Sequence, residues 1–157
     1  MGFKIIAIDG PTGVGKSTIA RQLAGKLDYL YVDTGAMFRC LAWSWAAQGS
    51  PESDESLEKL GDQTKIFFEN EKVICDDTDV TQEIRTEQIS TQASKISLFP
   101  SIREVMKKQQ RALVEEVRRS ESYQGAVLEG RDIGTVVFPA ADFKFYVDAS
   151  PEIRAKR

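Results

Sequence analysis

The sequence contains no histidine and only two cysteines, Cys40 and Cys75. Without histidine the chain cannot build a histidine-ligated zinc site, or a Ser–His or Cys–His pair for nucleophilic catalysis. The two cysteines form no C-x-x-C pair. We therefore expect both to be small buried apolar residues rather than a disulfide or a reactive thiol pair.

Long apolar runs and a strong net charge are missing as well. The sequence shows no stretch of 18 apolar residues and no secretory leader, so we expect a cytoplasmic protein without a membrane partner. The formal net charge of −3 offers no general attraction to nucleic acid. Basic residues gather between positions 103 and 119, but glutamates are interspersed with them, which is typical of a solvated helix face.

What is present favours an α/β domain. The 157 residues are 41% hydrophobic, enough for one core with a small insertion. Residues 3–8 and 29–32 are apolar and β-rich, and a glycine-rich loop and an amphipathic helix at 17–27 separate them. This order predicts a right-handed βαβ unit and therefore a parallel sheet, and a helix at 36–47 follows it.

The middle of the chain departs from this alternation. Ser53 or Asp54 can cap a short acidic helix, and a hairpin of strands at 65–68 and 72–75 follows. The remaining predicted elements are helices at 86–97 and 101–119, strands at 125–128 and 143–147, and a helix starting at Ser150-Pro151. We predict a core domain of residues 1–47 and 96–157, with an inserted subdomain of residues 48–95.

A phosphate-binding loop lies between the first predicted strand and helix. Residues 10–17 match G-x-x-x-x-G-K-S in the strand–loop–helix context that separates a P-loop from a chance match. Glycines let consecutive N–H groups converge on one anion, Lys16 can reach the β- and γ-phosphates, and Ser17 can bind Mg²⁺. The predicted residues of this site are Gly10, Pro11, Thr12, Gly13, Val14, Gly15, Lys16, Ser17 and Thr18.

A P-loop specifies a nucleoside triphosphate but leaves the reaction open. The sequence has no N-K-x-D or T-K-x-D guanine signature, which argues against a GTPase. It also lacks four apolar residues closed by Asp-Glu, the usual metal site of motor ATPases. Both absences weaken these two classes without naming the reaction, so any acceptor site must be sought in other residues.

Two segments indicate where a second phosphate would bind. Thr34 and Arg39 follow the second predicted strand in the segment DTGAMFR, at the sheet edge where ligands bind in open α/β folds. Glu129, Arg131 and Asp132 follow a later apolar strand in LEGRDIGTVVFP, where Gly130 and Gly134 mark an irregular turn. The alternatives are a helix N-cap with a surface arginine for the first segment, and a local salt bridge for the second.

A third group of segments, at 78–86, 92–97 and 100–111, combines hydroxyl side chains with Arg85, Arg103 and Arg111. Taken alone, these segments favour amphipathic helices with solvated charges.

The segments IAIDGPTGVGKSTIA, LYVDTGAMFR, DVTQEIRT, FPSIREVMKKQQR and EGRDIGTVVFP occur in this order along the chain. Together they resemble a bacterial-type cytidylate kinase of the nucleoside monophosphate kinase superfamily, over residues 4–157. The resemblance implies the P-loop nucleoside monophosphate kinase fold, a parallel sheet flanked by helices with a small inserted monophosphate-binding subdomain. It implies ATP-dependent phosphorylation of CMP and dCMP with Mg²⁺, by a monomer that acts in pyrimidine metabolism.

The resemblance also implies roles for individual residues. Thr34, Arg39 and Arg131 would bind the α-phosphate of CMP. Ser94 and Arg103 would recognise the edge of the cytosine ring. Lys16, Arg131 and Asp132 would be the catalytic residues, and Ser17 the metal ligand. Arg85 and Arg111 are weaker matches.

The resemblance stops at RAKR, the end of the sequence. A complete family member continues with an arginine-rich lid, a further helix and an adenine-contacting loop. The resemblance therefore implies that this chain lacks the lid, which supplies part of the positioning and water exclusion that phosphoryl transfer needs. Two alternatives stay open: another P-loop small-molecule kinase, such as one acting on shikimate, and a non-catalytic nucleotide-binding fragment.

Overall fold

The computed structural model of the chain describes residues 2–156. The described residues form two compact units. The first comprises the residues up to Thr34 and those from Gln110 onward, and the second comprises Gly35–Gln109. Helices α2 (Thr34–Ala47) and α5 (Pro100–Ser120) run across the two boundaries.

The first unit is built around a parallel sheet. Its four strands lie in the order β2-β6-β1-β7, so the two central strands are far apart in the sequence. The elements are β1 (Lys4–Asp9), α1 (Lys16–Leu27), β2 (Leu30–Asp33), β6 (Gly125–Gly130), a wide helical turn η2 (Ile133–Val137), β7 (Phe143–Tyr146) and α6 (Pro151–Ala155). The predicted α/β class and parallel sheet are confirmed.

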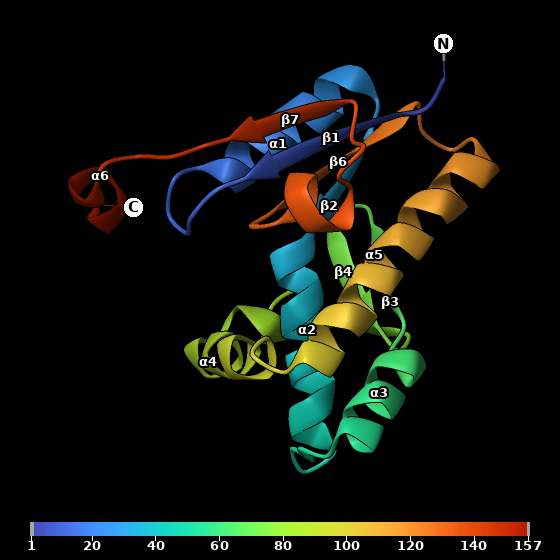
Figure 1. Cartoon of the computed structure of the whole chain (residues 1–157), viewed down its shortest axis with the longest axis vertical. Helices are drawn as coiled ribbons and strands as arrows, with labels where there is room; N and C mark the ends of the chain where they lie inside the picture. Colours follow the sequence, from blue (N-terminus) through green and yellow to red (C-terminus); the bar gives the residue numbers. More distant parts are fainter. Residues whose placement is uncertain (1, 157) are drawn as a thin grey trace. The chain divides into compact units, whose positions relative to one another are not determined.

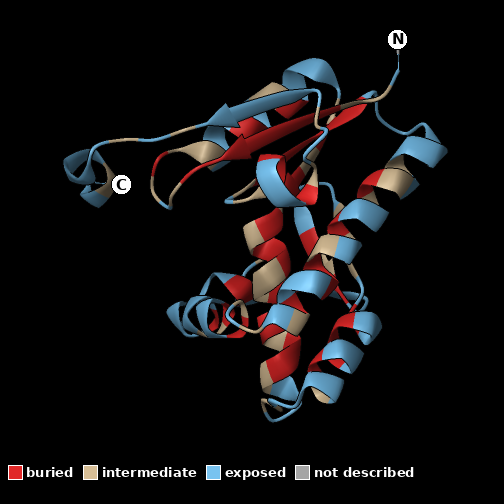
Figure 2. Cartoon of the chain, viewed as in Figure 1, coloured by how far each residue is buried: buried red, intermediate tan, exposed pale blue. Residues whose placement is uncertain are grey.

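The core of this unit lies between the sheet and α1 (Figure 1). Buried side chains from β1, β6 and α1 pack together there: Ile6, Ile8, Ala20, Ala24 and Val127. The central strands are buried because helices and neighbouring strands cover them, which explains their continuous apolar runs. Figure 2 shows β1 buried over most of its length.

Strand β7 differs from the other strands of this sheet. It pairs with β1 on one side only, and all four of its residues are exposed. Phe143, Phe145 and Tyr146 expose 52%, 51% and 71% of their surfaces. Figure 2 shows the strand coloured as exposed. The sheet therefore ends, among the residues described, in an uncovered aromatic edge.

The second unit is mainly helical. Besides most of α2 and the first half of α5, it contains α3 (Asp54–Gln63), β3 (Ile66–Glu69), β4 (Lys72–Cys75), β5 (Thr78–Asp79), a short turn η1 (Glu83–Arg85) and α4 (Glu87–Ile96). Ser53 caps α3 as predicted, because its hydroxyl accepts from the amide of Ser56 at 3.2 Å. The hairpin is also confirmed, and Asn70 and Glu71 form its turn with positive φ angles.

Both cysteines are buried in this unit, as expected, and neither forms a disulfide with a described residue. Cys75 in β4 places its sulfur 3.8 Å from the carbonyl oxygen of Cys40 in α2. Among the helices described, none is long and apolar enough to cross a bilayer.

Helices α3 and α5 approach closely at Gly61, which is buried against Val105. A Cβ at Gly61 would overlap the Val105 side chain, so we expect Gly61→Ala to lower the free energy of unfolding by about 2 kcal/mol. Gly25 in α1 is the matched control, because a Cβ there meets nothing within 4 Å. Gly25→Ala should raise the free energy of unfolding by about 0.5–1 kcal/mol. Urea unfolding measures both; equal effects at the two positions would contradict the close packing.

Candidate functional site

The P-loop joins the end of β1 to the start of α1, and its glycines are required by geometry. Gly13 and Gly15 have φ angles of 82° and 93°, in the left-handed region that favours glycine. Gly10 is extended, but a Cβ there would collide with the carbonyl oxygen of Val147. The same backbone segment is held by a hydrogen bond from the Val147 amide to the carbonyl of Asp9, 2.8 Å long.

The N-terminus of α1 is free to bind an anion. The helix begins at Lys16, after the N-cap Gly15, and its described first turn holds no acidic residue and no capping side chain. The Ser17 and Thr18 side chains are exposed beside these amides. Uncapped amides and the positive end of the helix dipole together favour a phosphate group.

Lys16 folds back over the loop. Its ammonium group donates to the carbonyl oxygen of Pro11 at 2.7 Å and is half-buried. Burial is the main cause of a lowered pKa for Lys16, and the positive charge of Arg131 also acts against its protonated form. The Glu129 carboxylate opposes that shift.

Arg131 and Asp132 lie in the turn that follows β6. The Arg131 guanidinium donates to the Thr12 hydroxyl at 2.5 Å, so this turn contacts the P-loop directly. A backbone hydrogen bond joins the same two segments: the Gly10 amide donates to the Gly130 carbonyl oxygen at 3.2 Å. Asp132 precedes η2, and its carbonyl accepts from the amides of Val136 and Val137. Among the described residues Arg131 and Asp132 form no salt bridge with each other, and the Arg131 guanidinium contacts Thr12 instead.

Thr34 is buried at the end of β2, and its hydroxyl donates to the carbonyl of Glu129 in β6 at 2.6 Å. The first unit therefore brings Thr34, Arg131, Asp132 and the P-loop to the carboxyl ends of adjacent parallel strands. This is the sheet edge at which α/β folds bind ligands.

Two acidic residues in this unit were not among the predicted site residues. The buried carboxylate of Asp9 accepts from the amides of Ile133 and Gly134 at 2.9 and 2.8 Å, which fixes the turn after Arg131 to the P-loop strand. The sequence feature that could have indicated this role is an acidic residue at the end of an apolar strand, directly before Gly10.

Glu129 is the second, only 4% exposed, and accepts a hydrogen bond from the Tyr31 hydroxyl. Burial raises the pKa of this carboxyl, whereas the hydrogen bonds from Tyr31 and Ser17 lower it. The sequence feature that could have indicated Glu129 is its place directly after the apolar strand residues GAVL. Burial likewise raises the pKa of Tyr31, so its hydroxyl remains a donor.

Three other predicted site residues belong to the second unit. Arg39 is half-buried in α2, Ser94 is exposed in α4 and donates to the Ser90 carbonyl at 3.1 Å, and Arg103 is exposed in α5. The weaker candidates contact backbone: Arg85 donates to the Thr81 carbonyl at 3.0 Å. Arg111 donates to the carbonyls of Val137 and Val136, at 2.8 and 3.2 Å, and so supports η2 from within the first unit.

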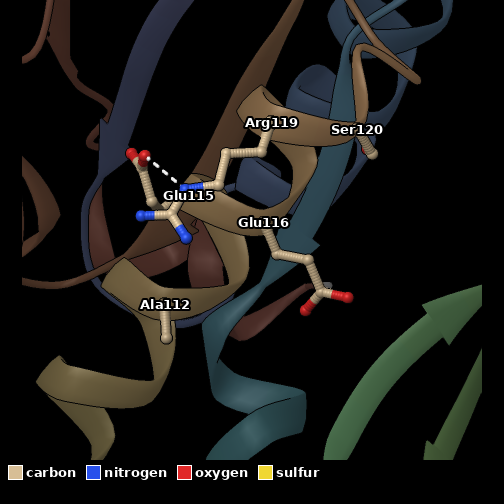
Figure 3. Close-up of a pocket in the computed structure, with 5 residues that line it drawn as sticks. All are labelled: Ala112, Glu115, Glu116, Arg119 and Ser120. Atoms are coloured by element: carbon tan, nitrogen blue, oxygen red, sulfur yellow. Dashed lines mark hydrogen bonds and ion pairs between the residues drawn. The ribbon is translucent and has the colours of Figure 1, made fainter.

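An open surface pocket lies elsewhere, along the C-terminal half of α5 (Figure 3). It contains none of the predicted site residues. Its lining includes an exposed ion pair in which Arg119 donates to Glu115 at 3.1 Å. Such i,i+4 pairs are ordinary features of solvated helix faces.

The donor set fits Mg²⁺ held largely by phosphates. Among the described residues no group of three or more acidic or cysteine side chains is placed to form a metal cage. Mg²⁺ in phosphoryl-transfer sites commonly takes only one or two protein oxygens, with nucleotide and water oxygens completing its shell. The Ser17 hydroxyl beside the buried Glu129 carboxyl supplies such oxygens.

Comparison with known proteins shows the family. The family model described as cytidylate kinase matches residues 6–157. Curated cytidylate kinases from Nitratidesulfovibrio vulgaris strain Hildenborough and Chloroherpeton thalassium are 44% and 45% identical, over 99% and 98% of this chain. One from Syntrophotalea carbinolica is 46% identical over 98% of the chain.

The chain spans 64–66% of the length of these relatives. Among solved structures, TT1252 from Thermus thermophilus aligns with a TM-score of 0.47 and 22% identity, over 99% of this chain and 71% of that one. By the family model and the curated relatives, this chain belongs to the cytidylate kinase family.

Proposed function

We propose that the protein transfers a phosphoryl group from ATP to CMP or dCMP, giving ADP and CDP or dCDP. The observation that carries this proposal is the direct contact of Arg131 with Thr12 of the P-loop. It sets an arginine fork, suited to phosphate oxygens, beside the loop that would hold the donor phosphates. Membership of the cytidylate kinase family supports the choice of CMP as acceptor.

In this proposal the chain acts by positioning and electrostatics. The amides of residues 10–18 hold the ATP phosphates, and Lys16 neutralises charge on the transferring group. Thr34, Arg39 and Arg131 bind the CMP phosphate, and Asp132 orients arginines and substrate. Ser17 and Glu129 would hold Mg²⁺ and its water ligands, and the ion would neutralise phosphate charge. The acceptor oxygen attacks in line, without a covalent enzyme intermediate.

Base recognition is assigned to the second unit. We propose that Ser94 and Arg103 pair with polar groups of cytosine, within a monophosphate-binding subdomain of residues 48–95 and its flanking helix. A site that pairs the polar edge of a base rejects other bases strongly. We further propose a monomeric cytoplasmic enzyme, in line with a family that works on small nucleotides.

ADP release in the presence of CMP, dCMP, UMP, AMP, GMP or shikimate tests the proposal. We expect CMP and dCMP to be preferred, and we expect Arg131→Ala to lower kcat/KM for CMP about 10- to 100-fold, the loss of one or more charge-assisted contacts. Arg119→Ala, which removes an exposed ion pair, is the matched control and should stay within about twofold. Equal turnover with AMP or shikimate would overturn the acceptor; ATP binding without turnover would favour a binding module.

A further inference from the structure

The hydroxyl of Tyr31 lies against the carboxyl of Glu129 inside the first unit. The strand register explains the contact. Asp33 is the register partner of Glu129, and Tyr31, two residues earlier, points to the same face of the sheet. A long side chain reaches such a diagonal neighbour. The arrangement therefore follows from the pairing of β2 with β6.

The Tyr31 ring is held from its other side. The Arg21 guanidinium of α1 lies over the ring, 5.5 Å from its centre, and the ring packs against the core between α1 and the sheet. A ring fixed in this way fixes the direction in which its hydroxyl donates. The Tyr31 hydroxyl therefore donates to Glu129 from one fixed position, because both the strand and the ring are held in place.

Glu129 in turn faces the P-loop. The Ser17 hydroxyl and the Lys16 charge both favour the ionised form of its carboxyl and lower its pKa, which places the two P-loop residues near it. Asp33, its register partner, carries a like charge on the same face. Tyr31, Ser17 and Lys16 therefore stabilise the buried Glu129 carboxylate, and the charge of Asp33 destabilises it.

We infer that Tyr31 is a positioning residue for the donor site: it holds Glu129 against Ser17 and so sets how strongly magnesium strengthens nucleotide binding at the P-loop. The inference rests on the proposed donor site, and not on the identity of the acceptor. Groups that orient metal-site oxygens from behind typically change metal affinity by about 10- to 100-fold when removed. Loss of this one neutral donor should lie at the lower end of that range.

Tyr31→Phe tests the inference, because it keeps the ring and its contact with Arg21 and removes only the hydroxyl. The dissociation constant of ATP is measured by calorimetry with excess Mg²⁺ and again with EDTA. We expect the magnesium-dependent gain in affinity to fall about tenfold in Tyr31→Phe, while the constant in EDTA changes less than about twofold. A purely structural role would shift both constants together.

Tyr29→Phe is the matched control. Tyr29 is a half-buried tyrosine packed against the same core, and among the described residues its hydroxyl makes no hydrogen bond. Its magnesium-dependent gain should equal that of the wild-type chain. Glu129→Gln provides a second variant: it should lower the gain as well, and adding Tyr31→Phe to it should cause less than about a further twofold loss, because the two changes break one chain of contacts.

An unchanged gain in Tyr31→Phe overturns the inference, as does full additivity with Glu129→Gln. A wild-type chain that binds no ATP, with or without Mg²⁺, overturns both the donor site and the inference. A wild-type chain that binds ATP but does not phosphorylate CMP overturns the proposed acceptor only, and the ratio of the two dissociation constants still decides the role of Tyr31.

Discussion

Lys16→Ala is expected to lower kcat/KM for CMP phosphorylation, and the affinity for Mg²⁺-ATP, by about 10²–10³-fold. Lys16 is the cation at the start of α1, and its ammonium already lies over the loop on the Pro11 carbonyl. In the proposed donor site the ammonium would exchange that carbonyl for a β- or γ-phosphate oxygen. Loss of one preorganised charge at a transferring group has effects of this size. Coupled ADP release and calorimetry measure the two quantities.

Lys26→Ala is the control for this experiment. Lys26 is exposed in the last turn of α1, at the opposite end of the helix from the loop, so its loss should change ATP affinity less than about twofold. Lys16→Ala should also lower the free energy of unfolding by no more than about 2 kcal/mol, because the one bond lost is the half-buried, charge-assisted bond from its ammonium to the Pro11 carbonyl. ATP affinity within threefold of wild type would place the donor phosphates elsewhere.

Asp9→Ala is expected to lower the free energy of unfolding by about 3 kcal/mol and to reduce CMP turnover at the same time. The substitution leaves the buried amides of Ile133 and Gly134 without an acceptor, and each bond to a charged group contributes roughly 1.5–3 kcal/mol. The turn carrying Arg131 would then lose its attachment to β1. Urea unfolding gives the first quantity, and kcat/KM for CMP gives the second.

Asp9→Asn separates the two bonds, since an asparagine side chain keeps one acceptor oxygen; its effect should lie between those of wild type and Asp9→Ala. Asp62→Ala is the surface control. Asp62 is exposed in α3 and makes no side-chain hydrogen bond among the described residues, so its removal should change stability less than about 0.5 kcal/mol. A loss below 1 kcal/mol for Asp9→Ala would contradict the role of this carboxylate.

Local chemistry made much of the fold predictable. The P-loop glycines and Lys16 can be recognised from a few neighbouring residues. The same holds for the predicted N-caps Ser53 and Ser150, each of which accepts from the amide three residues later. The hairpin turn was equally local. Helix α2 begins at Thr34, two residues before the predicted start, and the two-residue strand β5 was not predicted because its pairing, and not its composition, defines it.

Long-range contacts set the limits of sequence reasoning. Nothing near Arg131 indicates that its guanidinium meets Thr12, which lies 119 residues away. The order β2-β6-β1-β7 likewise depends on pairings between distant segments. Asp9 and Glu129 resemble ordinary strand-end acids until that order places one under the Arg131 turn and the other beside Tyr31. The roles of Arg39, Ser94 and Arg103, like those of the site residues in the first unit, stay predictions.

The aromatic edge formed by Phe143, Phe145 and Tyr146 has a practical consequence for the experiments above. An exposed strand with one unpaired side and apolar side chains in water is a template on which a second chain can add a strand. Protein concentration thereby becomes a hidden variable in a titration, since self-association would compete with or mimic ligand effects. Affinities for this chain should therefore be compared at several protein concentrations, and values that drift with concentration discarded.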